Sequence, residues 1–243
     1  MWYRGLQLKS NADRNKIDAV AKTLLIGPQG DKFTDVSFTV DLTVNGAGGL
    51  DVGSEVINQW YDLVAVLKRR GGLARIDGMF VKSGDTPVFP PRYSAFDRLS
   101  SHRNNGSGDL YRFTNAGDSN WFFYNENVGA GDFLVLSNGI STVYVDVNTG
   151  AVIPPTSRYG NGHVHYRKTT ATDIGIHVAW RSNDMGNRTA IGTEIFAGNQ
   201  GNLQNVRWRV PVFYNVDSSQ IFEYSMVGNG EASFAVHGYE DIR

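Results

Sequence analysis

Apolar and polar residues alternate along several segments of the chain. In residues 36–44 every second residue is apolar, and the residues between them are Ser, Thr and Asp. A period of two is typical of a β-strand that buries one face. The same alternation recurs in residues 174–180 and 206–216. Pro211 lacks an N–H group for a neighbouring strand, so we expect 206–216 at a sheet edge or at a bulge.

Other segments are apolar on both faces, which is typical of central strands in packed sheets. These are residues 61–67 and 133–136. The 28 glycines gather in turn-like breaks and disfavour helices. Only residues 13–24 and a turn at 54–58 have helical spacing, and a strand over 19–26 fits equally well. We therefore predict an all-β fold, an antiparallel β-sandwich or jelly-roll-like architecture with little helix.

A division of the chain is expected near residues 148–155. Pro154 and Pro155 enforce an extended backbone, and the alternation restarts beyond them. This predicts an N-terminal β-sandwich lobe over 1–150 and a C-terminal β lobe over 151–243. A single continuous β domain is the alternative, because sandwiches of this length occur as one domain.

Composition excludes several classes of partner. The chain has 23 basic and 24 acidic residues, a formal net charge of −1, so no excess charge attracts nucleic acid or an anionic membrane. Cysteine is absent, which removes disulfides and thiolate metal sites. The first residues lack the apolar core of a secretory signal, and no stretch approaches the ~18 apolar residues of a membrane span. We expect no nucleic-acid partner and no membrane insertion.

Motifs of catalysis are also missing. The sequence has no P-loop, no Gly-Xaa-Ser-Xaa-Gly and no His-Glu-Xaa-Xaa-His. Its carboxylates are scattered, and the long repeat of a β-helical polysaccharide depolymerase is absent. We therefore predict no catalytic residues, no cofactor and no enzyme activity, and we rank a depolymerase below the binding functions considered next.

Consecutive aromatic residues at 121–124 suggest a binding surface. Four neighbours in a strand cannot all face one core, so either Trp121 and Phe123 or Phe122 and Tyr124 point out of their own sheet. Outward aromatic rings beside Asn and Asp are typical of sugar sites, which makes Trp121 and Tyr124 candidate ligand-binding residues. The alternative is that the second face packs on another sheet or another subunit.

Polar loops supply further candidates, at residues 100–109 and 181–188. Either is suited to recognition at the end of a sandwich, and either is equally typical of an ordinary solvated connection. The candidate ligand-binding residues in them are His102, Asn104, Asn105, Asp109, Arg181 and Asn183.

Four short sequence segments, landmarks spread over most of the chain, resemble those of a known protein family. They are Gly-Gly-Leu-Asp-Val-Gly-Ser at 48–54, Gln-Trp-Tyr at 59–61, a proline-rich segment at 86–93 and His-Gly-Tyr-Glu-Asp-Ile-Arg at 237–243. In order and spacing these resemble a family of bacteriophage and prophage virion proteins, described as tail-associated or fibre-like. We expect the proline-rich segment to cross one end of the sheets, anchored by Phe89 and Tyr93.

The resemblance implies a virion structural protein, assembled in the bacterial cytoplasm as a homotrimer with other virion proteins. It would be a subunit of a tail fibre, tail tip or head-attached appendage. The more specific hypothesis is that its loops and outward aromatic residues bind polysaccharide on the host surface. The alternative is a purely architectural adaptor, collar or capsid decoration protein. In a trimer, His163 and His165 from three copies could surround a metal ion, because residues two apart in a strand share a face; otherwise they are an exposed pair beside a turn.

Overall fold

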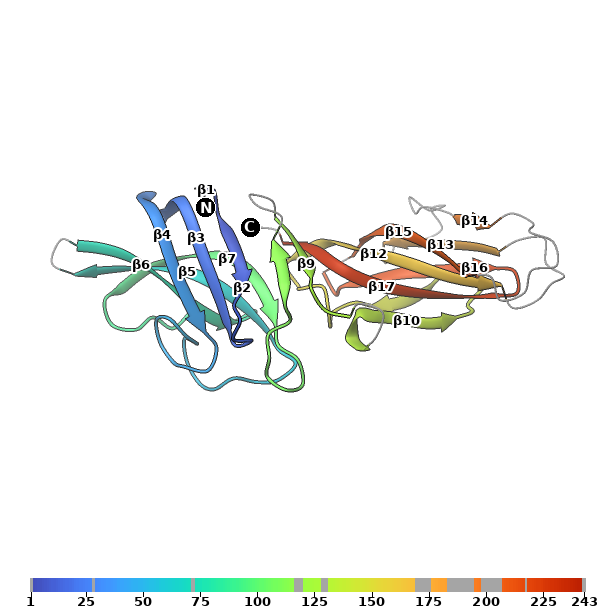
Figure 1. The fold of residues 1–243 in the computed structure, drawn as a ribbon, viewed down its shortest axis with the longest axis horizontal. Coiled ribbons are helices and arrows are strands. Elements are labelled where there is room, and N and C mark those ends of the chain that lie inside the picture. The colour runs from blue at the N-terminus through green and yellow to red at the C-terminus, as the bar shows by residue number, and fades with distance from the viewer. Residues whose placement is uncertain are drawn as a thin grey trace. The chain divides into compact units, whose positions relative to one another are not determined.

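The protein is built almost entirely of antiparallel strands (Figure 1). The computed structural model describes residues 2–27, 29–70, 73–115, 120–127, 131–168, 176–182, 195–197, 207–216 and 218–241. Within these ranges the only helical element is a 3-10 turn, Gly131–Phe133. The prediction of an all-β sandwich with little helix is confirmed. The chain forms two compact units, a first unit of Met1–Glu126 with Asp241–Arg243 and a second unit of Asn127–Glu240.

This division differs from the expected boundary near residue 150. Residues 149–155 form a connection between two strands inside the second unit, where the Thr149 N–H and hydroxyl both donate to Gln220 O, at 2.8 and 2.6 Å. Val152 and Ile153 in the same connection are fully buried. Proline marks an extended backbone, but it does not distinguish a turn within a domain from a boundary between domains.

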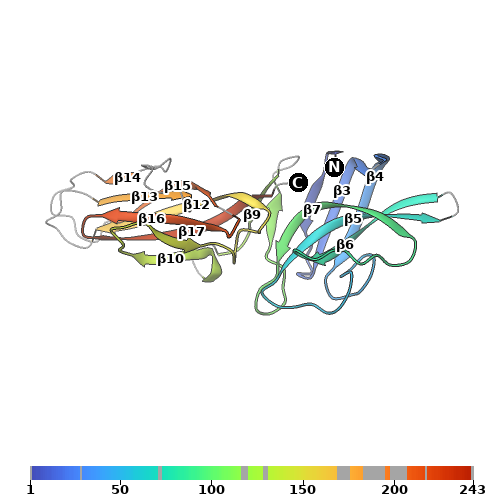
Figure 2. The same ribbon diagram turned by 180° about the vertical axis from the view of Figure 1, so that it is seen from behind.

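The first unit is a sandwich of two antiparallel sheets. Its larger sheet has the order β4 (Asp31–Asp41), β3 (Lys16–Ile26), β2 (Gln7–Ser10), β8 (Phe113–Asn115) and β9 (Trp121–Tyr124), with β1 (Trp2–Arg4) beside β2 on the same edge of β3. The smaller sheet has the order β6 (Leu73–Lys82), β5 (Trp60–Arg70) and β7 (Tyr93–Arg103). From the front β3 and β4 lie over β5 and β6, and the view from behind reverses the order (Figure 2).

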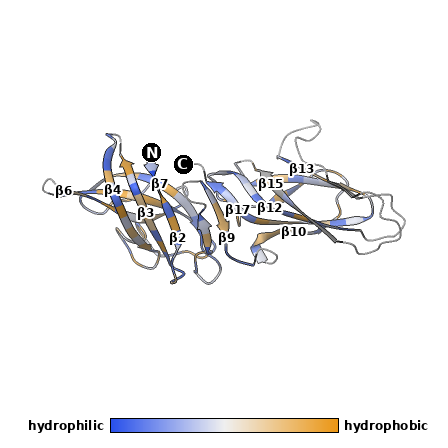
Figure 3. Ribbon diagram, turned by 45° about the horizontal axis from the view of Figure 1, so that its top comes forward, coloured by the Kyte–Doolittle hydropathy of each residue, from blue (hydrophilic) through white to orange (hydrophobic). Residues whose placement is uncertain are grey.

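Strand β3 settles the choice left open for residues 13–26. Its burial alternates, with Ile17, Ala19 and Ala21 inside, so the strand is favoured over the helix. Hydrophilic and hydrophobic residues alternate visibly along β3 and β4 (Figure 3). The expected turn of helix at residues 54–58 is absent from the described structure there.

Strand β5 is the central strand that its two apolar faces predict. On its outer face Val64 and Val66 join Met79 in a buried cluster. Phe89 and Tyr93 of the proline-rich segment pack against this cluster, so their role as anchors is confirmed. A crossing segment, not a third sheet, therefore covers the second face of β5.

Gly78 on the inner face of β6 marks the closest approach of the two sheets. A Cβ atom at this position would lie 2.3 Å from Val40 Cγ2 and 2.4 Å from Phe38 Cε2. We expect Gly78→Ala to lower the free energy of unfolding by about 1–3 kcal/mol, because overpacking outweighs the gain from restricting the unfolded chain. Urea denaturation measures this change. Gly106→Ala is the control, since the nearest atom to a Cβ added at Gly106 lies 3.8 Å away. Equal stability of the two variants would contradict the close packing at Gly78.

The described residues of the second unit form eight strands in two four-stranded sheets. One sheet has the order β10 (Leu134–Gly139), β17 (Gly230–Asp241), β12 (Ser157–Lys168) and β15 (Arg207–Asn215). The other has the order β11 (Val145–Asn148), β16 (Ile221–Val227), β13 (Ile176–Ser182) and β14 (Ile195–Ala197). With the strands lettered A to H along the chain, the orders are A-H-C-F and B-G-D-E, which is the connectivity of a jelly roll.

Aromatic side chains join the two sheets of this jelly roll. The ring centroid of Phe234 on β17 lies 6.0 Å from Trp180, 5.2 Å from Phe222 and 5.8 Å from Tyr224. Strand β15 lies at the end of its sheet, as Pro211 predicts. The prediction that residues 133–136 form a central strand is wrong, because β10 pairs only with β17 among the described strands and Leu134 and Leu136 are half-buried.

Candidate functional site

The aromatic residues of β9 face both ways from their sheet. Phe122 is fully buried, and its ring centroid lies 5.5 Å from that of Phe113. On the opposite face Trp121 and Phe123 are stacked, with centroids 6.0 Å apart and an interplanar angle of 17°. Phe123 is 36 % exposed. The outward aromatic pair is therefore Trp121 and Phe123.

Tyr124 does not belong to this outward pair. Strand alternation places it on the side of Phe122, and its ring meets Tyr111 edge-on at 6.0 Å. Burial raises the pKa of the Tyr124 hydroxyl well above its usual value. Both aromatic candidates are half-buried; Trp121 lies beside the exposed ring of Phe123, and Tyr124 packs against Tyr111 on the other face.

A groove opens next to the outward pair, between β2 and β8. We call it the β2–β8 groove; residues 7–12 and 112–115 line it together with Asn125, and its volume is about 520 Å³. The two strands pair only at Lys9 and Thr114. Beyond that pair the Ser10 hydroxyl accepts from Phe113 N–H at 2.8 Å and donates to Phe113 O at 3.2 Å. A side chain thus replaces backbone pairing, and the strands diverge around the groove.

Strand register connects the groove to the aromatic pair. Lys9 lies opposite Thr114, and Thr114 lies opposite Phe123. Directly opposed residues share a face of the sheet, with Cβ atoms about 4.5–5.5 Å apart. A cation, a hydroxyl and an exposed ring therefore form one row across β2, β8 and β9. Asn125 extends the polar side of this row through hydrogen bonds with the Thr114 hydroxyl at 2.9 and 3.0 Å.

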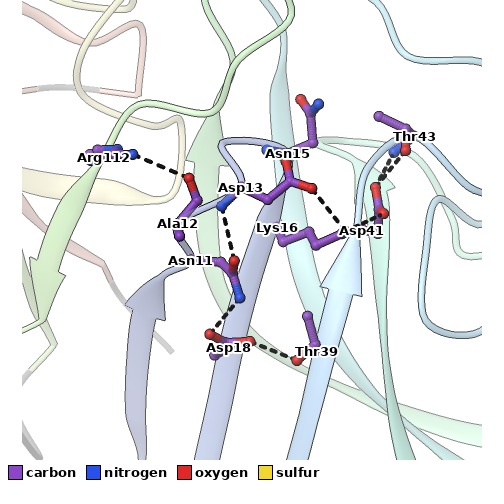
Figure 4. Close-up of polar contacts among 10 residues, drawn as sticks. All are labelled: Asn11, Ala12, Asp13, Asn15, Lys16, Asp18, Thr39, Asp41, Thr43 and Arg112. Carbon is purple, nitrogen blue, oxygen red and sulfur yellow. Dashed lines mark hydrogen bonds and ion pairs between the residues drawn. The ribbon is translucent and has the colours of Figure 1, made fainter.

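The turn between β2 and β3 forms a rim of the groove and is joined by polar contacts (Figure 4). Asn11 accepts from Asp13 N–H at 3.0 Å and donates to Asp18 at 2.8 Å. The Lys16 ammonium lies 2.8 Å from Asp13 and 3.3 Å from Asp41. Arg112 donates to Ala12 O at 3.3 Å from the other side. These contacts hold the rim in place without a ligand, as a preformed binding site requires.

The carboxylates behind this rim remain ionised. Hydrogen bonds from the Lys16 ammonium and then the Asn15 N–H lower the pKa of Asp13. Burial acts to raise the pKa of Asp41 and is the largest single influence, but hydrogen bonds from Thr43 and Lys16 together lower it. A glycosidase needs one carboxyl group with a raised pKa as its general acid. Asp13 and Asp41 have the opposite shift.

Two candidate residues of the predicted recognition loop 100–109, His102 and Asn104, are buried. His102 stacks on Phe113 at 4.4 Å, and its Nε2 lies 2.6 Å from the Ser100 hydroxyl. Asn104 donates to Glu55 at 2.7 Å and accepts from Gln59 N–H at 2.8 Å. The prediction of an exposed loop is wrong for these two residues. His102 lies within β7, and Asn104 joins the end of β7 to the segment that precedes β5. Neither side chain is accessible to an external ligand.

The remaining loop candidates are separate from the groove. Asn105 caps a turn, accepting from the N–H groups of Ser107 and Asp109 at 2.8 and 3.1 Å. In the second unit Arg181 pairs with Glu223 at 2.6 Å and lies 3.8 Å above the ring of Tyr144. Asn183 lies outside the described residues.

The His163–His165 pair has a third neighbour that its spacing could not reveal. His163 Nδ1 lies 2.5 Å from His237 Nε2, because β12 and β17 are adjacent in the jelly roll. The ring of His165 lies 4.4 Å from that of His163. Among the described residues, no group of three or more His, Cys, Asp or Glu side chains is placed to hold a metal ion. Metal binding by His163 and His165 of several copies stays a prediction.

Three polar residues of the groove carry no sequence signal of a site: Gln7, Lys9 and Arg112. Gln7 and Lys9 have the ordinary spacing of a solvated strand face, and Arg112 follows a turn. They meet only because β2 pairs with a strand about a hundred residues later. A long-range pairing of this kind cannot be read from one sequence.

Comparison with known proteins gives no family. The chain matches no protein-family model and no curated protein. The described part of the chain contains no helix with the length and apolar character needed to cross a membrane.

Proposed function

We propose that this protein is a structural subunit of a bacteriophage particle that binds polysaccharide on the host surface through the β2–β8 groove. The observation that carries the proposal is the stacked, outward Trp121–Phe123 pair beside a polar groove. A sugar ring has an apolar C–H face that stacks on aromatic rings and hydroxyl groups that need hydrogen-bond partners. The aromatic pair and the polar groove together supply both kinds of contact from one sheet.

The virion assignment rests on the resemblance of the sequence landmarks, and their positions support reading them as parts of one fold. The 48–54 segment bonds to β6, with Gly48 N–H donating to Gly78 O at 2.8 Å. The proline-rich segment covers β5, and Asp241 of the last landmark is buried against Arg98 of β7. Three landmarks thus lie in the first unit, and the last landmark joins it through Asp241. Jelly rolls such as the second unit occur in capsid and lectin domains, which is support by analogy alone.

Immunogold electron microscopy of the parent particles tests the virion assignment. Label on a tail tip or on projecting fibres agrees with an attachment protein. Label on the head or collar favours the architectural alternative, and unlabelled particles would contradict the virion assignment.

An architectural subunit is the second candidate, favoured by exposed apolar residues of the second unit. Ile140, Val143 and Val227 are 69, 66 and 59 % exposed. They lie near one another, because Met226 N–H donates to Ser141 O at 2.7 Å. Subunit contacts commonly cover such residues, in a homotrimer or against other virion proteins. Sedimentation velocity gives the oligomeric state of the protein.

A screen of purified bacterial surface polysaccharides separates the candidates. We expect the protein to bind at least one polysaccharide without releasing reducing ends from it. Binding to none would favour the architectural subunit. Release of reducing ends would identify a depolymerase, for which the lowered pKa values of Asp13 and Asp41 give no support.

A further inference from the structure

Positive charge is concentrated in the lining of the β2–β8 groove. Lys9 and Arg112 are the charged residues among the described residues that line it, and both are cationic. The protein as a whole is close to neutral, with a formal net charge of −1. The imbalance is therefore a local property of the groove.

Lys9 is available to a ligand. It is exposed on the outer face of β2, and it forms no ion pair with the described residues. Its cross-strand neighbour is Asp18, whose two oxygens already accept from Asn11 at 2.8 Å and from the Thr39 hydroxyl at 2.6 Å. The hydrogen-bonding capacity of the Lys9 ammonium is left for the groove.

Arg112 is only partly satisfied within the described residues. Its guanidinium donates from Nη2 to Ala12 O at 3.3 Å, and its Nε is buried without a hydrogen-bond partner. A guanidinium with unused donors gains from a nearby anion. The planar fork of Nη groups suits the two oxygens of a carboxylate.

Gln7 completes a set of donors on this face. It precedes Lys9 by two residues, so both side chains project from the same face of β2, and both are exposed. Lys9 lies two strands from Phe123, a separation of about 10 Å from the spacing of paired strands. One short oligosaccharide can reach from the ring of Phe123 to the ammonium of Lys9.

We propose that the β2–β8 groove selects acidic polysaccharides, holding a sugar carboxylate between Lys9 and Arg112 while a sugar ring stacks on Phe123. This inference rests on the proposed glycan-binding function and adds the class of glycan. Bacterial polysaccharides that carry uronic, sialic or pyruvyl carboxylates have the required chemistry. Neutral polysaccharides lack the anion that would pair with the two cations.

The test uses the full chain and a panel of acidic and neutral bacterial polysaccharides of known composition. The strongest acidic binder is measured before and after chemical reduction of its carboxyl groups, which leaves a neutral polymer with the same backbone. We expect reduction to weaken binding at least tenfold. Lys9→Gln should weaken binding of the native polymer about tenfold, the usual effect of one charge-assisted hydrogen bond, and leave the reduced polymer unaffected.

Matched variants control for charge and folding. Lys32→Gln removes one positive charge from an exposed position of β4 in the same sheet and should leave binding unchanged. Lys9→Arg keeps the charge and should restore most of the affinity. Added salt should weaken binding of the native polymer more than binding of the reduced one.

The outcomes separate this inference from the proposed function. Binding that needs Phe123, carboxylates and Lys9 supports both. Binding that needs Phe123 but is equal for native and reduced polymers, or is unaffected by Lys9→Gln, overturns acidic selectivity and leaves glycan binding intact. Failure of every polysaccharide to bind overturns both.

Discussion

Replacing Asp241 with alanine is expected to lower the free energy of unfolding by about 3–5 kcal/mol, the usual cost of breaking a buried ion pair. The Asp241 side chain is fully buried, and its carboxylate lies 2.5 Å from Arg98 Nη2. It also accepts from Ser101 N–H at 2.6 Å. Among the described residues, the carboxylate of Asp62 at 3.3 Å would then remain beside Arg98, which is itself mostly buried. Urea denaturation followed by tryptophan fluorescence measures the change.

A surface ion pair provides the control for this prediction. Asp31 pairs with Arg69, whose side chain is 52 % exposed, so Asp31→Ala should cost less than about 1 kcal/mol. Combining Asp241→Ala with Arg98→Met should recover part of the lost stability, because it removes the unpaired charge. A cost below about 1 kcal/mol for Asp241→Ala would show that the last landmark does not hold the first unit together.

Alanine at Phe123 or Trp121 is expected to weaken polysaccharide binding about thirtyfold each, equivalent to about 2 kcal/mol for a central aromatic contact. The two rings stack on each other outside the core, so either substitution removes part of the platform on which a sugar would lie. Stability should change little at Phe123, which is already 36 % exposed. Titration calorimetry with the best polysaccharide from the screen measures the affinity.

Phe96→Ala is the matched control for the aromatic platform. Phe96 is 40 % exposed, belongs to the same unit and has an aromatic neighbour, Phe89, at 5.6 Å. Its removal should leave binding unchanged. Loss of particle assembly with Trp121→Ala or Phe123→Ala, at unchanged polysaccharide affinity, would instead assign these rings to a subunit contact.

Local pattern predicts the strands of this protein well where one face is buried. Strict alternation identifies β4, β13 and β15, and two apolar faces identify β5 as central. The same signal misplaces β10, because an apolar run that is only half-buried at a sheet edge looks like a central strand in sequence. A local pattern also fails to locate the boundary between the two units, since the prolines near residue 154 belong to a turn inside the second unit.

The candidate site could be predicted only in part, for the same physical reason. Four consecutive aromatic residues require that some point outward, so the sequence identifies β9 as a possible platform. Which pair points outward depends on where the core lies. The core lies on the side of Phe122, so Phe123 is on the outer face of β9 and Tyr124 is on the core side. Lys9 and Arg112 line one groove because β2 pairs with β8, and no local sequence pattern encodes that pairing.

The most direct test of the central claim is a crystal structure of the full chain with an oligosaccharide prepared from the polysaccharide that it binds. We predict a sugar ring against Phe123, with its neighbours extending into the β2–β8 groove toward Lys9 and Arg112. An oligosaccharide bound elsewhere, such as on the jelly roll of the second unit, with the groove empty, would contradict the account.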